Sequence, residues 1–192
     1  MEIVTAINFD CHVNVSMDAS MDRRGDAVMN FDFEKNARFM GRFDLSNPDA
    51  PRCGWVNSAI FIRFNGSEIK MVAEDSSGKD CVEIVLDGIA RNWMQLQEGV
   101  HEYIIESGLD DYVHTLEIHK RTELLYGSIT FLDFTLPKEG EFLSPPEAKT
   151  LKLEYYGDSI TNGSGNRHPH ELRDAPHAAV PYLVEFALGG LH

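Results

Sequence analysis

Cysteines and basic residues are scarce in this chain, and each scarcity excludes a class of protein. The three cysteines, Cys11, Cys53 and Cys81, are an odd number at wide spacings, which argues against a disulfide framework and against a zinc site. Lysine and arginine number 17 against 31 aspartates and glutamates, so the formal net charge is -14. That charge repels nucleic-acid phosphates and anionic lipid surfaces. We therefore expect reduced thiols, and neither nucleic acid nor a membrane as a partner.

Long apolar runs are also missing. No stretch approaches the roughly 20 apolar residues that a membrane-spanning helix needs. Residues 1–10 have no basic segment followed by an apolar core, which a signal peptide would have. The sequence as printed therefore predicts a cytoplasmic location. Hydrophobic residues make up 43% of the 192 positions, which is enough to build the core of one large domain or slightly more.

Short β-rich runs separated by turn signals fill residues 38–136, a texture typical of an antiparallel sandwich or barrel. Asn65-Gly66 and Asp87-Gly88 each lie between two apolar runs, so each predicts a β-hairpin. Two hairpins in succession indicate a meander or a jelly roll. The runs are 59–64 with 68–73, and 81–86 with 89–96.

Strict alternation marks residues 114–120 as a further strand, with His114, Leu116, Ile118 and Lys120 on one face. Its predicted partner is the run 128–136. Prolines and glycine then interrupt the pattern at 137–140 and again at 144–147, where two consecutive prolines exclude both helix and central strand. We place a domain boundary there.

A different kind of motif follows the boundary. Residues 151–156 read as a buried strand that leads into a sharp turn at Gly157-Asp158-Ser159. The Ser159 hydroxyl would then lie at the start of the next helix, where its own N–H can face a developing oxyanion. That arrangement is half of an acyl-transfer site. The alternative role for Ser159 is an ordinary helix N-cap.

The segment from Gly157 to Asn166 resembles the first sequence block of the SGNH (GDSL-type) hydrolases. Together with stretches before it, the chain is more narrowly similar to carbohydrate esterase family 2, in which a β-sandwich precedes an SGNH catalytic domain. These blocks occur in the order of the family, and they are residues 38–44, 62–66, 114–123, 144–147 and 157–166.

The resemblance implies a mainly β chain, in which a jelly-roll β-sandwich precedes the first βα unit of an incomplete α/β SGNH (flavodoxin-like) hydrolase domain. The implied organisation has four parts, which are an irregular lead-in at 1–37, the sandwich at 38–142, a Pro-rich linker at 143–150 and the incomplete hydrolase domain at 151–192.

The activity implied is that of an acetyl esterase, in which Ser159 is the nucleophile for deacetylation of acetylated polysaccharides or oligosaccharides, without a metal or another cofactor. In the family, a glycine, an asparagine and the general-base histidine come from later blocks, which are not found in this sequence. We therefore expect a truncated form with little activity alone. Asp174 and His177 have the Asp-x-x-His spacing, but only 18 residues separate His177 from Ser159, so we interpret the match as chance.

Two alternatives to a truncated esterase stay open. One is a carbohydrate-binding or interaction module that lacks catalysis. The other is a split enzyme, in which another polypeptide supplies the missing strands and the histidine.

Two groups of residues have competing interpretations. Four aromatic residues form either a sugar-stacking platform or part of the core, and we expect the core; they are Trp55, Trp93, Tyr103 and Tyr126. The run from Lys120 to Glu123 is either a polar cluster facing a sugar or a salt-bridged strand end at the sandwich surface, and we expect the strand end.

Overall fold

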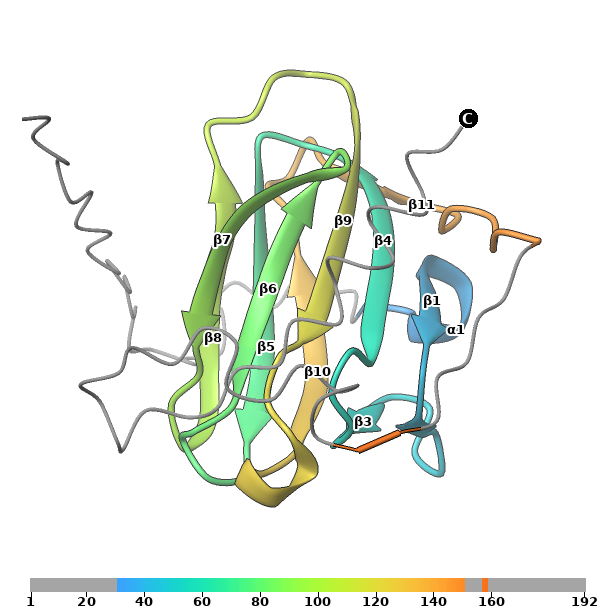
Figure 1. Ribbon diagram of the computed structural model, residues 1–192. Helices are drawn as coiled ribbons and strands as arrows, with labels where there is room; N and C mark the ends of the chain where they lie inside the picture. The colour runs from blue at the N-terminus through green and yellow to red at the C-terminus, as the bar shows by residue number, and fades with distance from the viewer. Residues whose placement is uncertain (1–30, 151–156, 159–192) are drawn as a thin grey trace, which may run out of the picture.

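Two antiparallel sheets packed face to face make up the protein in the computed structural model, which describes residues 31–150 and 157–158. Sheet A has six strands in the order β1–β4–β9–β6–β7, with β11 also paired to β4, and sheet B has five in the order β2–β3–β10–β5–β8. In Figure 1 the strands β6, β9 and β4 of sheet A lie in front of β5 and β10 of sheet B. The predicted β-sandwich is therefore confirmed.

The elements follow one another along the chain in the order α1 (Phe33–Asn36), β1 (Ala37–Met40), β2 (Phe43–Asp44), β3 (Arg52–Cys53), β4 (Ala59–Asn65), β5 (Glu68–Asp75), β6 (Cys81–Leu86), β7 (Ile89–Gln95), β8 (Gly99–Ser107), β9 (Val113–Lys120), η1 (Leu124–Tyr126), β10 (Ile129–Thr135) and β11 (Glu141–Leu143). From β4 to β10 the chain changes sheet at every connection except β6 to β7. Repeated crossing of this kind is the topology of a jelly roll.

The predicted hairpin at Asn65-Gly66 is wrong. The strand before it, β4, belongs to sheet A, and the strand after it, β5, belongs to sheet B. A two-residue hairpin of the favoured type needs positive φ at both central residues. Neither Asn65 nor Gly66 has a positive φ. The same short connection therefore carries the chain from one sheet to the other.

The predicted hairpin at Asp87-Gly88 is confirmed. Asp87 has φ 53° and Gly88 has φ 74°, which is the left-handed pair that this turn requires. Strands β6 and β7 pair antiparallel on either side of it, with Leu86 opposite Ile89.

The predicted pairing of residues 114–120 with 128–136 is wrong, although both are strands. Strand β9 pairs with β4 and β6 in sheet A, whereas β10 pairs with β3 and β5 in sheet B. The connection between them contains the turn η1 and crosses between the sheets. The predicted alternation is confirmed, because Leu116 and Ile118 are fully buried in the core between the sheets.

The core begins ahead of residue 38. Phe31 and Phe33 are both buried and belong to the cluster between the sheets. The Phe31 ring contacts Phe134 and Phe142 edge to face, with ring centroids 5.1 Å and 4.7 Å apart. The segment just before β1 therefore packs into the core between the sheets. Among residues 31–150 and 157–158, no helix has the length and apolar character needed to cross a bilayer.

Candidate functional site

The predicted nucleophile Ser159 lies outside the described residues, as do the strand predicted at 151–156 and the pair Asp174 and His177. Of the turn that precedes Ser159, the structure describes Gly157 and Asp158, and both are exposed. The role of Ser159 therefore stays a prediction. The site that can be built residue by residue lies within the sandwich.

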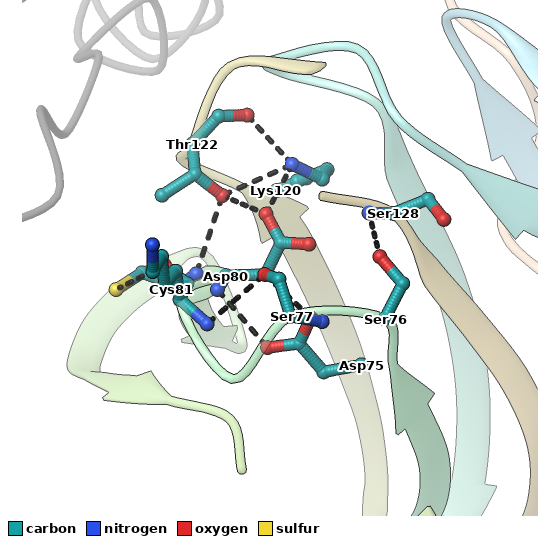
Figure 2. Close-up of polar contacts among 9 residues, drawn as sticks. Asp75, Ser76, Ser77, Asp80, Cys81, Lys120, Thr122 and Ser128 are labelled. Atoms are coloured by element: carbon teal, nitrogen blue, oxygen red, sulfur yellow. Dashed lines mark hydrogen bonds and ion pairs between the residues drawn. The ribbon is translucent and has the colours of Figure 1, made fainter. Parts of the chain in front are cut away.

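A buried polar cluster occupies the end of β9 and the connections beside it. The Lys120 ammonium donates to Asp80 Oδ1 at 2.5 Å, to the Thr122 carbonyl at 2.8 Å and to Thr122 Oγ1 at 3.0 Å. Neither the Lys120 nor the Asp80 side chain has any exposed surface. Figure 2 shows the polar ends of both side chains next to Thr122. A lysine has three donors, and here all three are used within the protein.

The Thr122 hydroxyl joins the cluster in both directions. It donates to Asp80 Oδ1 and accepts from the backbone N–H of Cys81 at 3.3 Å. Burial raises the pKa of Asp80, although the Lys120 charge and these hydrogen bonds oppose that rise. Its second oxygen, Oδ2, is buried without a hydrogen-bond partner. The cluster is thus closed to a substrate, and its charges stabilise one another.

The loop between β5 and β6 is fastened to the same cluster. Asp75 accepts the Ser77 N–H on Oδ1 and the Asp80 N–H on Oδ2, each at 3.0 Å. Ser76 Oγ accepts the N–H of Ser128, which follows η1. The Ser128–Ser76 bond joins the β5–β6 loop to the β9–β10 loop, as Figure 2 shows.

The run from Lys120 to Glu123 is therefore salt-bridged, as predicted. The prediction that it lies at the sandwich surface is wrong. Arg121 pairs with Glu83 at 3.1 Å, and the two side chains are only 6% and 10% exposed. The sequence could not indicate this burial, because Asp80 and Glu83 lie about 40 positions away on another strand and loop.

The four aromatic residues divide between core and surface. Tyr103 is buried, as predicted, and its hydroxyl accepts the Gln97 N–H at 2.9 Å. Trp55 is 50% exposed and Trp93 is 39% exposed, so their predicted place in the core is wrong. Tyr126 is half-buried. Trp93 lies on the edge strand β7, most of whose residues are exposed, and Trp55 lies in the connection between β3 and β4.

Each exposed indole has an arginine over its ring. The Arg42 guanidinium carbon lies 4.8 Å from the Trp55 ring centroid, and that of Arg121 lies 5.5 Å from the Trp93 ring. Cation–π contacts of this kind hold an indole in one orientation. A fixed, exposed indole presents a flat apolar face that suits a pyranose ring. Within the described ranges, no group of three or more His, Cys, Asp or Glu side chains could hold a metal ion.

The fold defines the class of this protein as a two-sheet jelly-roll sandwich. A family model described as "Carbohydrate esterase 2 N-terminal" matches residues 39–146, which is more than half of the chain. The chain therefore belongs to the carbohydrate esterase 2 N-terminal family.

A curated relative is the cellulase/esterase CelE of Acetivibrio thermocellus, which is 33% identical over 128 residues. The match covers 67% of this chain and 16% of CelE. This chain thus corresponds to a small part of that relative.

Solved structures of the same class are similar over the sandwich. A family two carbohydrate esterase from Clostridium thermocellum, in complex with cellohexaose, has 31% identity and a TM-score of 0.64, covering 68% of this chain and 39% of that one. The fold is also shared with a family two carbohydrate esterase from Cellvibrio japonicus, at 20% identity and a TM-score of 0.69, with 76% and 43% of the two chains covered. The matched part of this chain spans about two fifths of the length of these solved chains.

Proposed function

We propose that this chain contributes to a serine-dependent carbohydrate esterase, and that Ser159 is the nucleophile that removes acetyl groups from polysaccharides or oligosaccharides. The observation that carries the proposal is the position of the family match. It ends at residue 146, and the Gly157-Asp158-Ser159 turn follows 11 residues later, where the resemblance to the SGNH hydrolases begins.

The proposed reaction has two steps. Ser159 Oγ attacks the acetyl carbonyl, its proton passes to a general base, and the sugar hydroxyl leaves with that proton, so that an acetyl-serine ester remains. A water molecule then gives its proton to the same base and attacks the ester, which releases acetate and restores the serine. The Ser159 N–H stabilises the oxyanion in both steps.

The general base comes from another part of this chain, such as His177, or from a partner chain. The test is acetate release from an activated acetate ester by the 192-residue chain and by Ser159→Ala. Ser164→Ala is the matched control, because Ser164 lies five residues further on in the same glycine-rich segment. We expect the chain to release acetate slowly, and we expect only Ser159→Ala to lose this low rate. Equal rates in all three proteins would contradict a nucleophilic role for Ser159 in this chain.

A second function is supported by the two exposed indoles. The sandwich would then act as a carbohydrate-binding module, with Trp55 and Trp93 as the faces on which sugars stack. Binding to cellohexaose or to acetylated xylan that is unchanged in Ser159→Ala and is lost in the tryptophan variants would favour this function. Binding that depends on Ser159 would instead favour the esterase site.

A further inference from the structure

Sheet A buries side chains on both of its faces. Its inward face belongs to the core between the sheets, but four more apolar residues are buried outside that core cluster. Ala59 and Phe61 on β4 are 0% and 6% exposed, and Cys81 and Val85 on β6 are 3% and 0% exposed. Pairing places all four on the opposite face of the sheet, together with His119 of β9. We call these five residues the outward face.

Polar residues on and beside the outward face are shielded as well. Glu83 lies between His119 and Trp93 in the strand register, and its ion pair with Arg121 is almost completely buried. His119 is 2% exposed and contacts the Phe61 ring edge to face. A sheet face that met only water would leave such groups exposed.

Sheet B behaves differently. Every second residue of β5 on its outer side is partly or fully exposed, and Lys70 there pairs with Glu68 and Glu102 with about a third of each side chain exposed. The outer side of β5 in sheet B therefore meets solvent, whereas the outward face of sheet A is covered. This difference between the sheets indicates that another segment packs on the outward face.

The path of the chain indicates which segment packs on the outward face. Arg38 of β1 lies on the same side of sheet A, with its guanidinium carbon 3.7 Å from the Phe61 ring centroid, and its Nε donates to the Pro146 carbonyl at 3.0 Å. The chain thus leaves the sandwich over the outward face. The other end enters elsewhere, because the Phe31 N–H donates to Asp133 of sheet B and the Phe31 ring lies in the core.

The chain after Pro146 is also long enough to cross the outward face. Leu151 follows Pro146 by five positions, and an extended chain of that length spans about 17 Å. Three strand spacings, from β1 across β4 and β9 to β6, amount to about 14 Å. The sequence after residue 150 begins with Leu151, Leu153 and Tyr155 at alternate positions, which is the pattern of a strand with one apolar side.

We propose that the outward face of sheet A is the docking surface for the segment of this chain that starts at Leu151. The sandwich then does more than precede the hydrolase-like segment, because it supplies an apolar wall on which that segment packs. This inference does not depend on whether Ser159 is catalytic.

Two native thiols provide the first test. Cys81 lies on the outward face and Cys53 lies in the core, and burial raises the pKa of both to about 12. In a Cys11→Ser background, each thiol is labelled with a maleimide and quantified by mass spectrometry. The full chain is compared with the double variant Leu151→Asp/Leu153→Asp and with the matched double variant Lys152→Ser/Glu154→Ser.

We expect the leucine variant to label Cys81 at least tenfold faster than the other two proteins, while Cys53 stays protected. Unchanged labelling of Cys81 with Cys53 protected would overturn the proposal. If both thiols become reactive, the sandwich has opened, and crosslinking in the unaltered segment then decides.

For crosslinking, p-benzoylphenylalanine replaces Phe61 in the full chain, and Val72 on the outer side of β5 serves as the control position. Irradiation is expected to join position 61 to peptides from residues 151–192. Crosslinks from position 61 to residues 1–30 or to a second molecule, or no crosslink at all, would overturn the proposal.

Discussion

Lys120 and Asp80 form an ion pair with a 2.5 Å separation and no exposed side-chain surface on either partner. The pair lies 40 residues apart in the sequence and joins the end of β9 to the loop that precedes β6. A buried charge costs several kcal/mol unless it is paired and hydrogen-bonded. Each of these two side chains therefore stabilises the fold only while the other is present.

Replacing Lys120 by methionine should destabilise the sandwich by about 3 to 5 kcal/mol, because it leaves the Asp80 carboxylate buried and uncompensated. The measurement is urea unfolding of the wild type, Lys120→Met and the double variant Lys120→Met/Asp80→Ala. The double variant should recover part of the loss, since it removes the orphaned charge. Lys70→Met is the control, and its partly exposed pairs predict a loss of about 1 kcal/mol or less. Equal losses for Lys70→Met and Lys120→Met would contradict this account.

Gly127 should be the least replaceable glycine near the cluster. A Cβ built there would lie 2.6 Å from Ser77 Oγ, 2.8 Å from Asp80 Oδ2 and 2.9 Å from Ser76 Oγ, and its φ is 146°. We expect Gly127→Ala to lower the free energy of unfolding by about 2 kcal/mol or more, which combines backbone strain and overpacking. Gly99→Ala is the matched control, because φ there is 88° and no atom lies within 4 Å of the added carbon. It should cost only the backbone term of about 1 kcal/mol, so a similar loss at both positions would argue against crowding.

The stability of the β6–β7 turn should depend on acid pH. His114 Nδ1 lies 2.8 Å from Asp87 Oδ2, and the Thr115 N–H donates to Asp87 Oδ1 at 2.8 Å. Burial acts to raise the pKa of Asp87, but these hydrogen bonds outweigh it and hold the pKa below its usual value. A carboxyl group with a lowered pKa stabilises the fold above its unfolded pKa of about 3.9, and this contribution is lost as the pH falls through the folded pKa.

The test is Asp87→Asn, because asparagine keeps the side-chain shape and tolerates the positive φ of residue 87. We expect the difference in unfolding free energy between wild type and variant to be largest near pH 7 and to shrink below about pH 4. A difference that stays constant down to pH 3 would show that the charge of Asp87 does not contribute.

Local sequence signals predicted the structure only where a local cause decides it. Asp87-Gly88 predicted its hairpin because both residues adopt the left-handed backbone that the turn needs. The same dipeptide logic failed at Asn65-Gly66, because the choice of sheet for β4 and β5 depends on partners far away in the sequence, such as β9 and β10. The alternation in residues 114–120 gave the correct faces of β9 but could not identify the strands beside it.

The candidate site shows the same division. The turn at Gly157-Asp158-Ser159 is a contiguous motif, so the sequence was enough to predict a nucleophile there. The buried polar cluster unites residues from the β5–β6 loop and the end of β9, and nothing in the sequence links Asp80 to Lys120. Exposure of Trp93 follows from its place on an edge strand, which becomes visible only when the order of strands in sheet A is known.

The two tryptophans of the chain offer a last prediction. Because Trp55 and Trp93 are both substantially exposed, their fluorescence in the folded protein should be quenched readily by acrylamide. If the sandwich stacks sugars on these rings, saturating cellohexaose should protect them, and Trp55→Phe and Trp93→Phe will show which ring is covered. Arg121 is held by Glu83 as well as by the indole, so Trp93→Phe should leave the free energy of unfolding within about 1 kcal/mol of wild type. Quenching that cellohexaose does not change would leave the indoles without a role in binding this sugar, and would favour the esterase over the binding module.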